Sequence, residues 1–165
     1  EFRRVLFRSA FTMQGLYAER HARAMLDAFV QLAVEKAPRN MGRLADSPVV
    51  QADVARREAT LGSAGVWLAQ LLKDVWATAD ETDVIGAQDR AKVRLGCSQA
   101  IHVAEEVANY VYKAAGTSSI FLGTPFERRF RDMHTLSQQI QSREQHFETV
   151  GRILFNGDPD GTFMG

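Results

Sequence analysis

The sequence is poor in cysteine, in net charge and in long apolar runs. Its single cysteine, Cys97, excludes an intramolecular disulfide and a paired-cysteine metal knuckle, and this usage fits a cytoplasmic protein best. The 20 basic and 20 acidic residues cancel. The chain therefore lacks the excess of positive charge that would indicate binding to nucleic acid or to an anionic membrane. No apolar stretch approaches the roughly 20 residues that cross a bilayer. With 165 residues, the chain is long enough to bury the core of one globular domain.

The first nine residues require separate treatment. Residues 1–9, from Glu1 to Ser9, are what a common sequencing-adapter DNA encodes, so we expect them to be a non-native tail. The natural protein is then expected to be longer upstream, and this chain to be a fragment of it. We expect residues 10–155 to form one helical domain. Residues 156–165 are expected to be a C-terminal tail, because they are rich in turn-forming residues.

Apolar residues recur with helical spacing in the first half of the chain. A first helix is predicted over about residues 12–36, ending before Pro38. A second is predicted to begin at Pro48, capped by Asp46 or Ser47. The expected buried stripes are Ala18, Ala22, Met25, Phe29 and Leu32 in the first helix, and Ala55, Ala59, Gly62, Val66, Ala69, Leu72 and Trp76 in the second.

The second half of the chain shows the same helical periodicity. A turn at Ala79 to Thr82 is predicted to lead into a third helix over about residues 83–115, which Gly116 ends. A fourth helix is predicted to follow Thr124, with Pro125 in its first position. The expected stripes are Val93, Cys97, Ala100, Ala104, Val107, Val111 and Ala114 in the third helix, and Phe126, Phe130, Met133, Ser137 and Ile140 in the fourth.

These elements predict an all-α fold. Ser142 to Gln145 fits a capping box, which would open a short fifth helix running to Phe155. Long helices joined by short turns lie antiparallel, so we expect an up-down four-helix bundle with that short helix added. The predicted second and third helices are both long and rich in alanine, and both carry apolar residues on more than one face. This pattern indicates a second buried surface, against other subunits or a missing upstream part.

Metal and nucleophile chemistry have little support in the sequence. A di-metal bundle needs Glu-x-x-His on two helices, whereas His102-x-x-Glu105 has the reverse order and occurs once. We interpret it as a solvated His–Glu pair on one helix face. Cys97 lies within an apolar stripe, where a buried cysteine packs as a small hydrophobe. A nucleophile elbow and a P-loop are both absent from the sequence.

The segment around the fourth helix carries the candidate binding residues. Arg128, Arg129 and Arg131 could contact an anionic group, although pairs with Glu127 and Asp132 would make a self-compensated surface, which the residues alone favour. The loop Gly116-Thr117-Ser118-Ser119 could cradle a phosphate, because small residues let the backbone approach a ligand. His134 could transfer protons near neutrality, although a lone helical histidine is more often structural.

One motif in this segment points to a family. The residues fit Pro-x-Glu-Arg-x-x-Arg-Asp, and with the glycine loop and the helix order over residues 10–160 they resemble the C-terminal helical domain of the acyl-CoA dehydrogenase superfamily. The resemblance implies that a helical and a β-domain precede this bundle, that bundles associate into homotetramers, and that flavin (FMN or FAD) lies between domains. It places Gly116, Thr117 and Ser118 near the flavin phosphates. The motif reads Pro125-Phe126-Glu127-Arg128-Arg129-Phe130-Arg131-Asp132.

The resemblance also helps to separate two chemistries within the superfamily. Many dehydrogenases follow the Arg-Asp pair with Glu-Gly-Thr, whose glutamate removes a proton from a CoA thioester; residues 133–140 contain no glutamate. That departure resembles the two-component flavin-dependent monooxygenases, which use reduced flavin, O2 and a partner flavin reductase on small aromatic or heteroaromatic substrates. Several of these place a histidine near the position of Gln139, so Gln139 and His134 are the catalytic candidates that the resemblance implies.

Two alternatives stay open at this point. An acyl-CoA dehydrogenase fits if its base lies on the first helix, although Arg39-Asn40-Met41-Gly42 only approximates the Arg-x-x-Phe-Gly motif of many dehydrogenases. A helical module that serves only oligomerisation, without cofactor, is the other alternative. We expect the fragment alone to be inactive in either enzyme case, because the flavin ring needs the missing β-domain to cover it.

Overall fold

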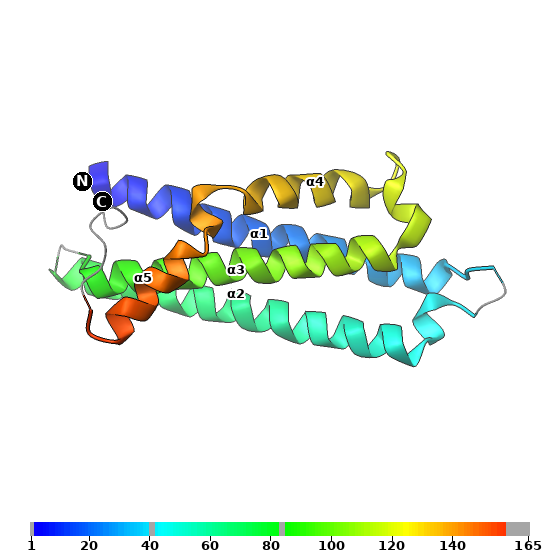
Figure 1. The fold of residues 1–165 in the computed structure, drawn as a ribbon, viewed down its shortest axis with the longest axis horizontal. Coiled ribbons are helices and arrows are strands. Elements are labelled where there is room, and N and C mark those ends of the chain that lie inside the picture. Colours follow the sequence, from blue (N-terminus) through cyan, green and yellow to red (C-terminus); the bar gives the residue numbers. More distant parts are fainter. Residues whose placement is uncertain (1, 40–41, 83–84, 158–165) are drawn as a thin grey trace.

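The computed structural model describes residues 2–39, 42–82 and 85–157, with the side chains of residues 2–11 and 79–82 left out. Asn40, Met41 and the turn residues 158–161 therefore lie outside the described part. Four long helices run up and down along one axis, with a short fifth helix at one end, as the sequence predicted (Figure 1). The elements are α1 (Phe2–Glu35), η1 (Leu44–Asp46), α2 (Pro48–Thr82), α3 (Ala87–Ala114), η2 (Gly116–Ile120), α4 (Pro125–Ser137), η3 (Ile140–Ser142) and α5 (Gln145–Leu154).

Helix α3 is the centre of the bundle and packs against α1, α2, α4 and α5. Its predicted stripe is confirmed, since the side chains from Val93 to Val111 in that stripe are at most 2% exposed. Ala114, the last of the stripe, is partly buried. No described helix is both long and apolar enough to cross a membrane.

The seam between α1 and α3 is closely packed because its facing residues are small. A Cβ added at Gly15 would lie 3.2 Å from the Cα of Cys97. Ala18 and Ala22 are fully buried on the same side of α1, and Phe29 continues the contact at an edge-to-face angle with Tyr110. Cys97 is fully buried, and this burial raises the pKa of its thiol to about 12. Its predicted role as a core residue is confirmed.

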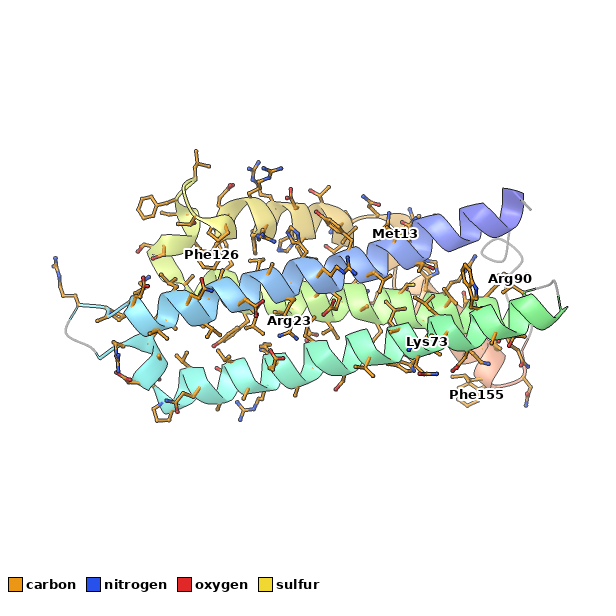
Figure 2. All side chains as sticks on the ribbon, turned by 180° about the vertical axis from the view of Figure 1, so that it is seen from behind. Met13, Arg23, Lys73, Arg90, Phe126 and Phe155 are labelled. Carbon is orange, nitrogen blue, oxygen red and sulfur yellow. The ribbon has the colours of Figure 1, made fainter. Side chains whose placement is uncertain are left out.

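The predicted stripe of α2 was mostly wrong, because Leu72 packs against the core but most of the other residues in the stripe are exposed. The residues of α2 that face the core are Leu61, Ala64, Leu68 and Val75, whereas Val66 is 73% exposed. Because α2 carries apolar and small residues on two faces, periodicity alone could not choose the face that packs within this chain. The outer face of α2, defined by Val49, Ala52, Ala55, Ala59, Ser63, Val66 and Trp67, is exposed. Arg23 of α1 lies between α1 and α2 (Figure 2) and pairs there with Glu58.

Two local predictions also need correction. The turn expected at Ala79 to Thr82 is part of α2, because no glycine or proline interrupts the helix there. Helix α3 instead begins at Ala87, after Gly86 as its N-cap. The capping box is not formed: Ser142 lies in η3, and its hydroxyl is directed at the carbonyl oxygens of Ser137 and Gln139, which share its one hydrogen.

Candidate functional site

The glycine loop lies where α3 passes into α4, at the end of the bundle at which α1 also ends (Figure 1). Helix α3 ends at Ala114, and Gly116 has φ +58°, the left-handed conformation expected of a residue that ends a helix. A side chain at Gly116 would therefore be strained. The Ser119 hydroxyl turns inward and donates to the Gly116 carbonyl oxygen at 2.6 Å. Thr117 is exposed to solvent.

Thr124 closes the other side of this loop. It precedes α4 as predicted, yet its hydroxyl makes no cap bond to the helix. Instead the hydroxyl lies 3.0 Å from the Ser118 carbonyl oxygen and 2.8 Å from that of Phe121. These contacts hold the loop against the start of α4, so the backbone of residues 116–118 has a defined shape.

A cation lies directly beside the loop. The ammonium of Lys36, just after α1, donates to the Ala115 carbonyl oxygen at 2.6 Å and to the Ser118 hydroxyl at 3.0 Å. No local sequence pattern marks Lys36, because the turn that places it here is set by tertiary packing. A left-handed glycine, an exposed threonine hydroxyl and an ammonium together suit an anionic group, so the residues fit the phosphate of a flavin.

His134 lies between α3 and α4 rather than in an open cleft. Its Nε2 is 3.0 Å from the Asn109 side-chain oxygen, and its Nδ1 is 3.3 Å from a Glu105 carboxylate oxygen. Its ring packs at 4.3 Å on Phe130, which stacks on Tyr112. With an acceptor at each nitrogen, the doubly protonated imidazolium can donate to both. Both ring nitrogens of His134 are therefore engaged by side chains of α3.

The interpretation of His102 and Glu105 as one pair was wrong. Glu105 faces His134 of α4, whereas the Nδ1 of His102 lies 3.6 Å from Glu144 and its Nε2 lies 2.7 Å from the Ser142 carbonyl oxygen. The two residues share a helix but contact different neighbours. Within the described ranges, His, Cys, Asp and Glu side chains form no group of three or more that could hold a metal ion.

Gln139 follows the last turn of α4 and contacts α1. Its side-chain oxygen accepts a hydrogen bond from the Gln14 amide. No local pattern marks Gln14, because it lies 125 positions from Gln139 in the chain. The side-chain oxygen of Gln14, Oε1, is buried without a hydrogen-bond partner among the described residues. The Gln14 side chain is therefore the polar neighbour that hydrogen-bonds to Gln139.

The structure places the candidate residues in two locations. The glycine loop precedes α4, whereas His134 and Gln139 lie near and beyond its C-terminal end. Because α4 has 13 residues, these ends are about 20 Å apart. Within one chain, the phosphate loop and the proposed proton carriers therefore do not form a single cluster.

The basic cluster of α4 is largely compensated by neighbouring carboxylates. Arg131 lies 2.6 Å from Glu127, and Arg128 lies 3.8 Å from Asp132, so both predicted pairs are confirmed. Arg129 takes part in no ion pair with another described residue, while its carbonyl oxygen lies 3.0 Å from the Nε2 of His21. Two of the three arginines therefore belong to a self-compensated surface.

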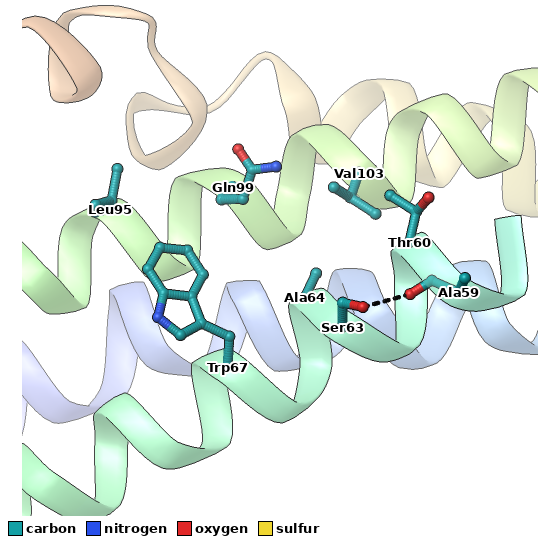
Figure 3. A pocket seen from close by; sticks show the side chains of 8 residues that line it. All are labelled: Ala59, Thr60, Ser63, Ala64, Trp67, Leu95, Gln99 and Val103. Carbon is teal, nitrogen blue, oxygen red and sulfur yellow. Dashed lines mark hydrogen bonds between the residues drawn. The ribbon is translucent and has the colours of Figure 1, made fainter. Parts of the chain in front are cut away.

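A groove of about 610 Å³ lies between α2 and α3 (Figure 3). Trp67 forms one wall, and the Ser63 hydroxyl beside it donates to the Ala59 carbonyl oxygen at 2.7 Å. None of its lining side chains ionises near neutral pH, so the groove supplies no acid or base. The lining residues are Ala59, Thr60, Ser63, Ala64, Trp67, Leu95, Gln99 and Val103.

Comparison with known protein families shows which family the bundle belongs to. The model of the family described as "Acyl-CoA dehydrogenase, C-terminal domain" matches residues 16–144. The chain belongs to this family. The match includes the glycine loop, α4 and Gln139, so the resemblance read from the motif is confirmed. An acyl-CoA dehydrogenase C-terminal domain of this kind is all-α, as the structure is.

Relatives and solved structures refine this assignment. The domain is 27% identical over 139 residues to the indole-3-acetate monooxygenase of Acinetobacter baumannii, and 29% identical over 143 residues to that of Pseudomonas putida. Each alignment covers 84% of this chain and 36% of the relative, so the chain spans about a third of their length.

Two solved structures share the fold at 18% identity, each with a TM-score of 0.82. XiaF from Streptomyces sp., in complex with FADH2 and glycerol, matches 90% of this chain over 38% of its own. The 3-HSA hydroxylase from Rhodococcus sp. RHA1 matches 94% of this chain over 40% of its own.

Proposed function

We propose that this chain is the C-terminal domain of a flavin-dependent monooxygenase that uses reduced flavin and O2 to hydroxylate a small aromatic or heteroaromatic substrate. The observation that carries the proposal is the match of 84% of the chain to two indole-3-acetate monooxygenases. The absence of a glutamate from residues 133–140 agrees with it, because a thioester dehydrogenase of the Glu-Gly-Thr type needs that base. We propose residues 10–155 as the functional domain and a cytoplasmic location for the whole protein.

The proposed roles follow from the geometry of each residue. Bound reduced flavin, FMN or FAD, would supply the electrons that activate O2. Gly116, Thr117 and Ser118 bind its phosphate, with the left-handed glycine allowing close approach. His134, which lies between Glu105 and Asn109, is the proposed proton carrier. Gln139, whose oxygen is occupied by Gln14, uses its amide hydrogens to orient the substrate.

We also propose that the whole protein is a homotetramer supplied with reduced flavin by a separate reductase. The exposed outer face of α2 supports assembly, because single-chain packing leaves Val66 73% and Val49 70% exposed. Further copies, or the domains that precede this one in full-length relatives, would cover that face. A cofactor site shared between copies would also explain why the candidate residues lie at two ends of α4.

The test uses the full-length protein with chemically reduced FAD or FMN. Anaerobic mixing followed by O2 should give oxygen consumption that depends on indole-3-acetate, together with a hydroxylated product. The variant Gly116→Val should weaken retention of reduced flavin, while Gly123→Val, an exposed glycine with no atom within 4 Å of a built Cβ, should not. Turnover of an acyl-CoA with an electron acceptor would identify a dehydrogenase instead. A full-length protein without flavin affinity would identify an oligomerisation module.

A further inference from the structure

The phosphate site proposed above lies at an electrostatically unfavourable place. It follows the C-terminal end of α3, a helix of 28 residues. The last carbonyl groups of a helix carry a partial negative charge and point out of that end. A phosphate next to Gly116 would meet this charge at close range. The site therefore needs a cation that neutralises the end of the helix.

Lys36 is placed to do so. Its ammonium donates to the Ala115 carbonyl oxygen at 2.6 Å, at the helix end itself. Its backbone is fixed on both sides, because its N–H donates to Leu32 and its carbonyl oxygen accepts from the Leu44 N–H at 2.9 Å. Lys36 is partly buried and forms no ion pair within the described part of the chain. Its charge is therefore not cancelled by a neighbouring carboxylate there.

The second contact of Lys36 orients a loop hydroxyl. The Ser118 oxygen accepts from the ammonium at 3.0 Å, so the hydroxyl keeps its own hydrogen as a donor. An ammonium carries three hydrogens, and these two contacts use two of them. The third hydrogen and the Ser118 hydroxyl can both serve an anion beside Gly116.

We propose that Lys36 is a positioning residue for the flavin phosphate: it neutralises the carbonyl end of α3, orients Ser118 and completes the positive side of the loop. This inference rests on the proposed function, because it needs a flavin phosphate at residues 116–118. It predicts that phosphate recognition, and not recognition of the flavin ring, depends on a residue 80 positions before the loop.

The experiment separates the phosphate from the ring. Full-length wild-type protein and the variants Lys36→Met and Lys36→Arg are titrated anaerobically with reduced FAD, reduced FMN and reduced riboflavin, which has no phosphate. Lys36→Met should weaken binding of the phosphate-bearing flavin at least tenfold and leave riboflavin unchanged. Lys36→Arg should retain most of the affinity, because the cation remains. The wild-type affinity should also fall more steeply with salt than that of Lys36→Met.

Lys113→Met is the matched control. Lys113 lies in the last turn of α3, the helix whose end Lys36 contacts, and its side chain is exposed. The variant therefore removes the same charge without a hydrogen bond to the loop. An equal loss of FAD, FMN and riboflavin binding in Lys36→Met would overturn the inference, because Lys36 would then act only through the fold. Unchanged binding of all three would overturn it as well. Wild-type protein that binds none of the three flavins would contradict the proposed function itself.

Discussion

The seam between α1 and α3 and the outer face of α2 are built from the same kinds of residue. Gly15, Ala18 and Ala22 line the seam, while Ala55, Ala59 and Val66 line the outer face. The seam is closed to water, whereas the outer face of α2 is open in the single chain. Small and aliphatic residues at helical spacing therefore predict contact, but not whether the contact is made within the chain or with another one.

The largest expected effect concerns the outer face of α2. If that face packs against another copy, Val66→Glu places a charge in an apolar contact and should weaken association by about 3 kcal/mol, or roughly a hundredfold. Sedimentation of the full-length protein at several concentrations measures the change. Val66→Ala adds no charge and serves as the control. A protein that sediments as a monomer before substitution would contradict the proposed assembly.

A pair of glycine substitutions compares the seam with α2 directly. Gly15→Ala brings a Cβ to 3.2 Å from the Cys97 backbone, so overpacking of about 1–3 kcal/mol should outweigh the gain of about 1 kcal/mol in helix propensity. Gly62→Ala meets no atom within 4 Å in the single chain and should raise the free energy of unfolding by up to about 1 kcal/mol. Urea denaturation measures both. Destabilisation by Gly62→Ala would show that another chain covers this part of α2.

The smallest expected effect is a pH dependence of the free energy of unfolding, which comes from the buried His146. Burial lowers the pKa of His146, and the nearby Arg94 and Arg143 lower it further against the opposing bond to the Ile140 carbonyl oxygen. The unfolded chain, with a histidine pKa of roughly 6.5, therefore binds more protons than the folded one as the pH falls. The free energy of unfolding should be fully retained above pH 6.5 and decrease below it.

His146→Gln tests this dependence. The glutamine amide can still donate to the Ile140 carbonyl oxygen but does not titrate. Unfolding curves between about pH 5 and 8 should be flatter for the variant than for the wild type. Parallel curves would show that His146 contributes no pH dependence.

Much of the fold was predictable because glycine, proline and periodicity agreed. Helix α3 is buried on several sides, so its predicted stripe lies in the core, and the left-handed glycine after it was also predicted. Helix α2 has apolar residues on two faces, so most of its predicted stripe lies on the exposed face. Ser142 has the sequence spacing of a capping box, but its hydroxyl hydrogen-bonds to carbonyl groups of the preceding turn instead.

The candidate site was predictable only where it is local in sequence. The loop at Gly116 and the pairs of Arg128 and Arg131 depend on residues within a few positions. Lys36 and Gln14 reach their partners across the bundle, so their roles depend on packing that no local pattern encodes. The roles of His134 and Gln139 stay predictions, and their contacts with Glu105 and Gln14 show which neighbours to vary with them.

The burial of Cys97 has a practical consequence. A thiol with a pKa of about 12 carries almost no thiolate at neutral pH and lies out of reach of solvent. Since it is the sole sulfhydryl of the chain, an alkylating reagent can mark a molecule only while its first and third helices have separated. The rate of labelling would thus count opening events of the domain's centre, without any engineered probe.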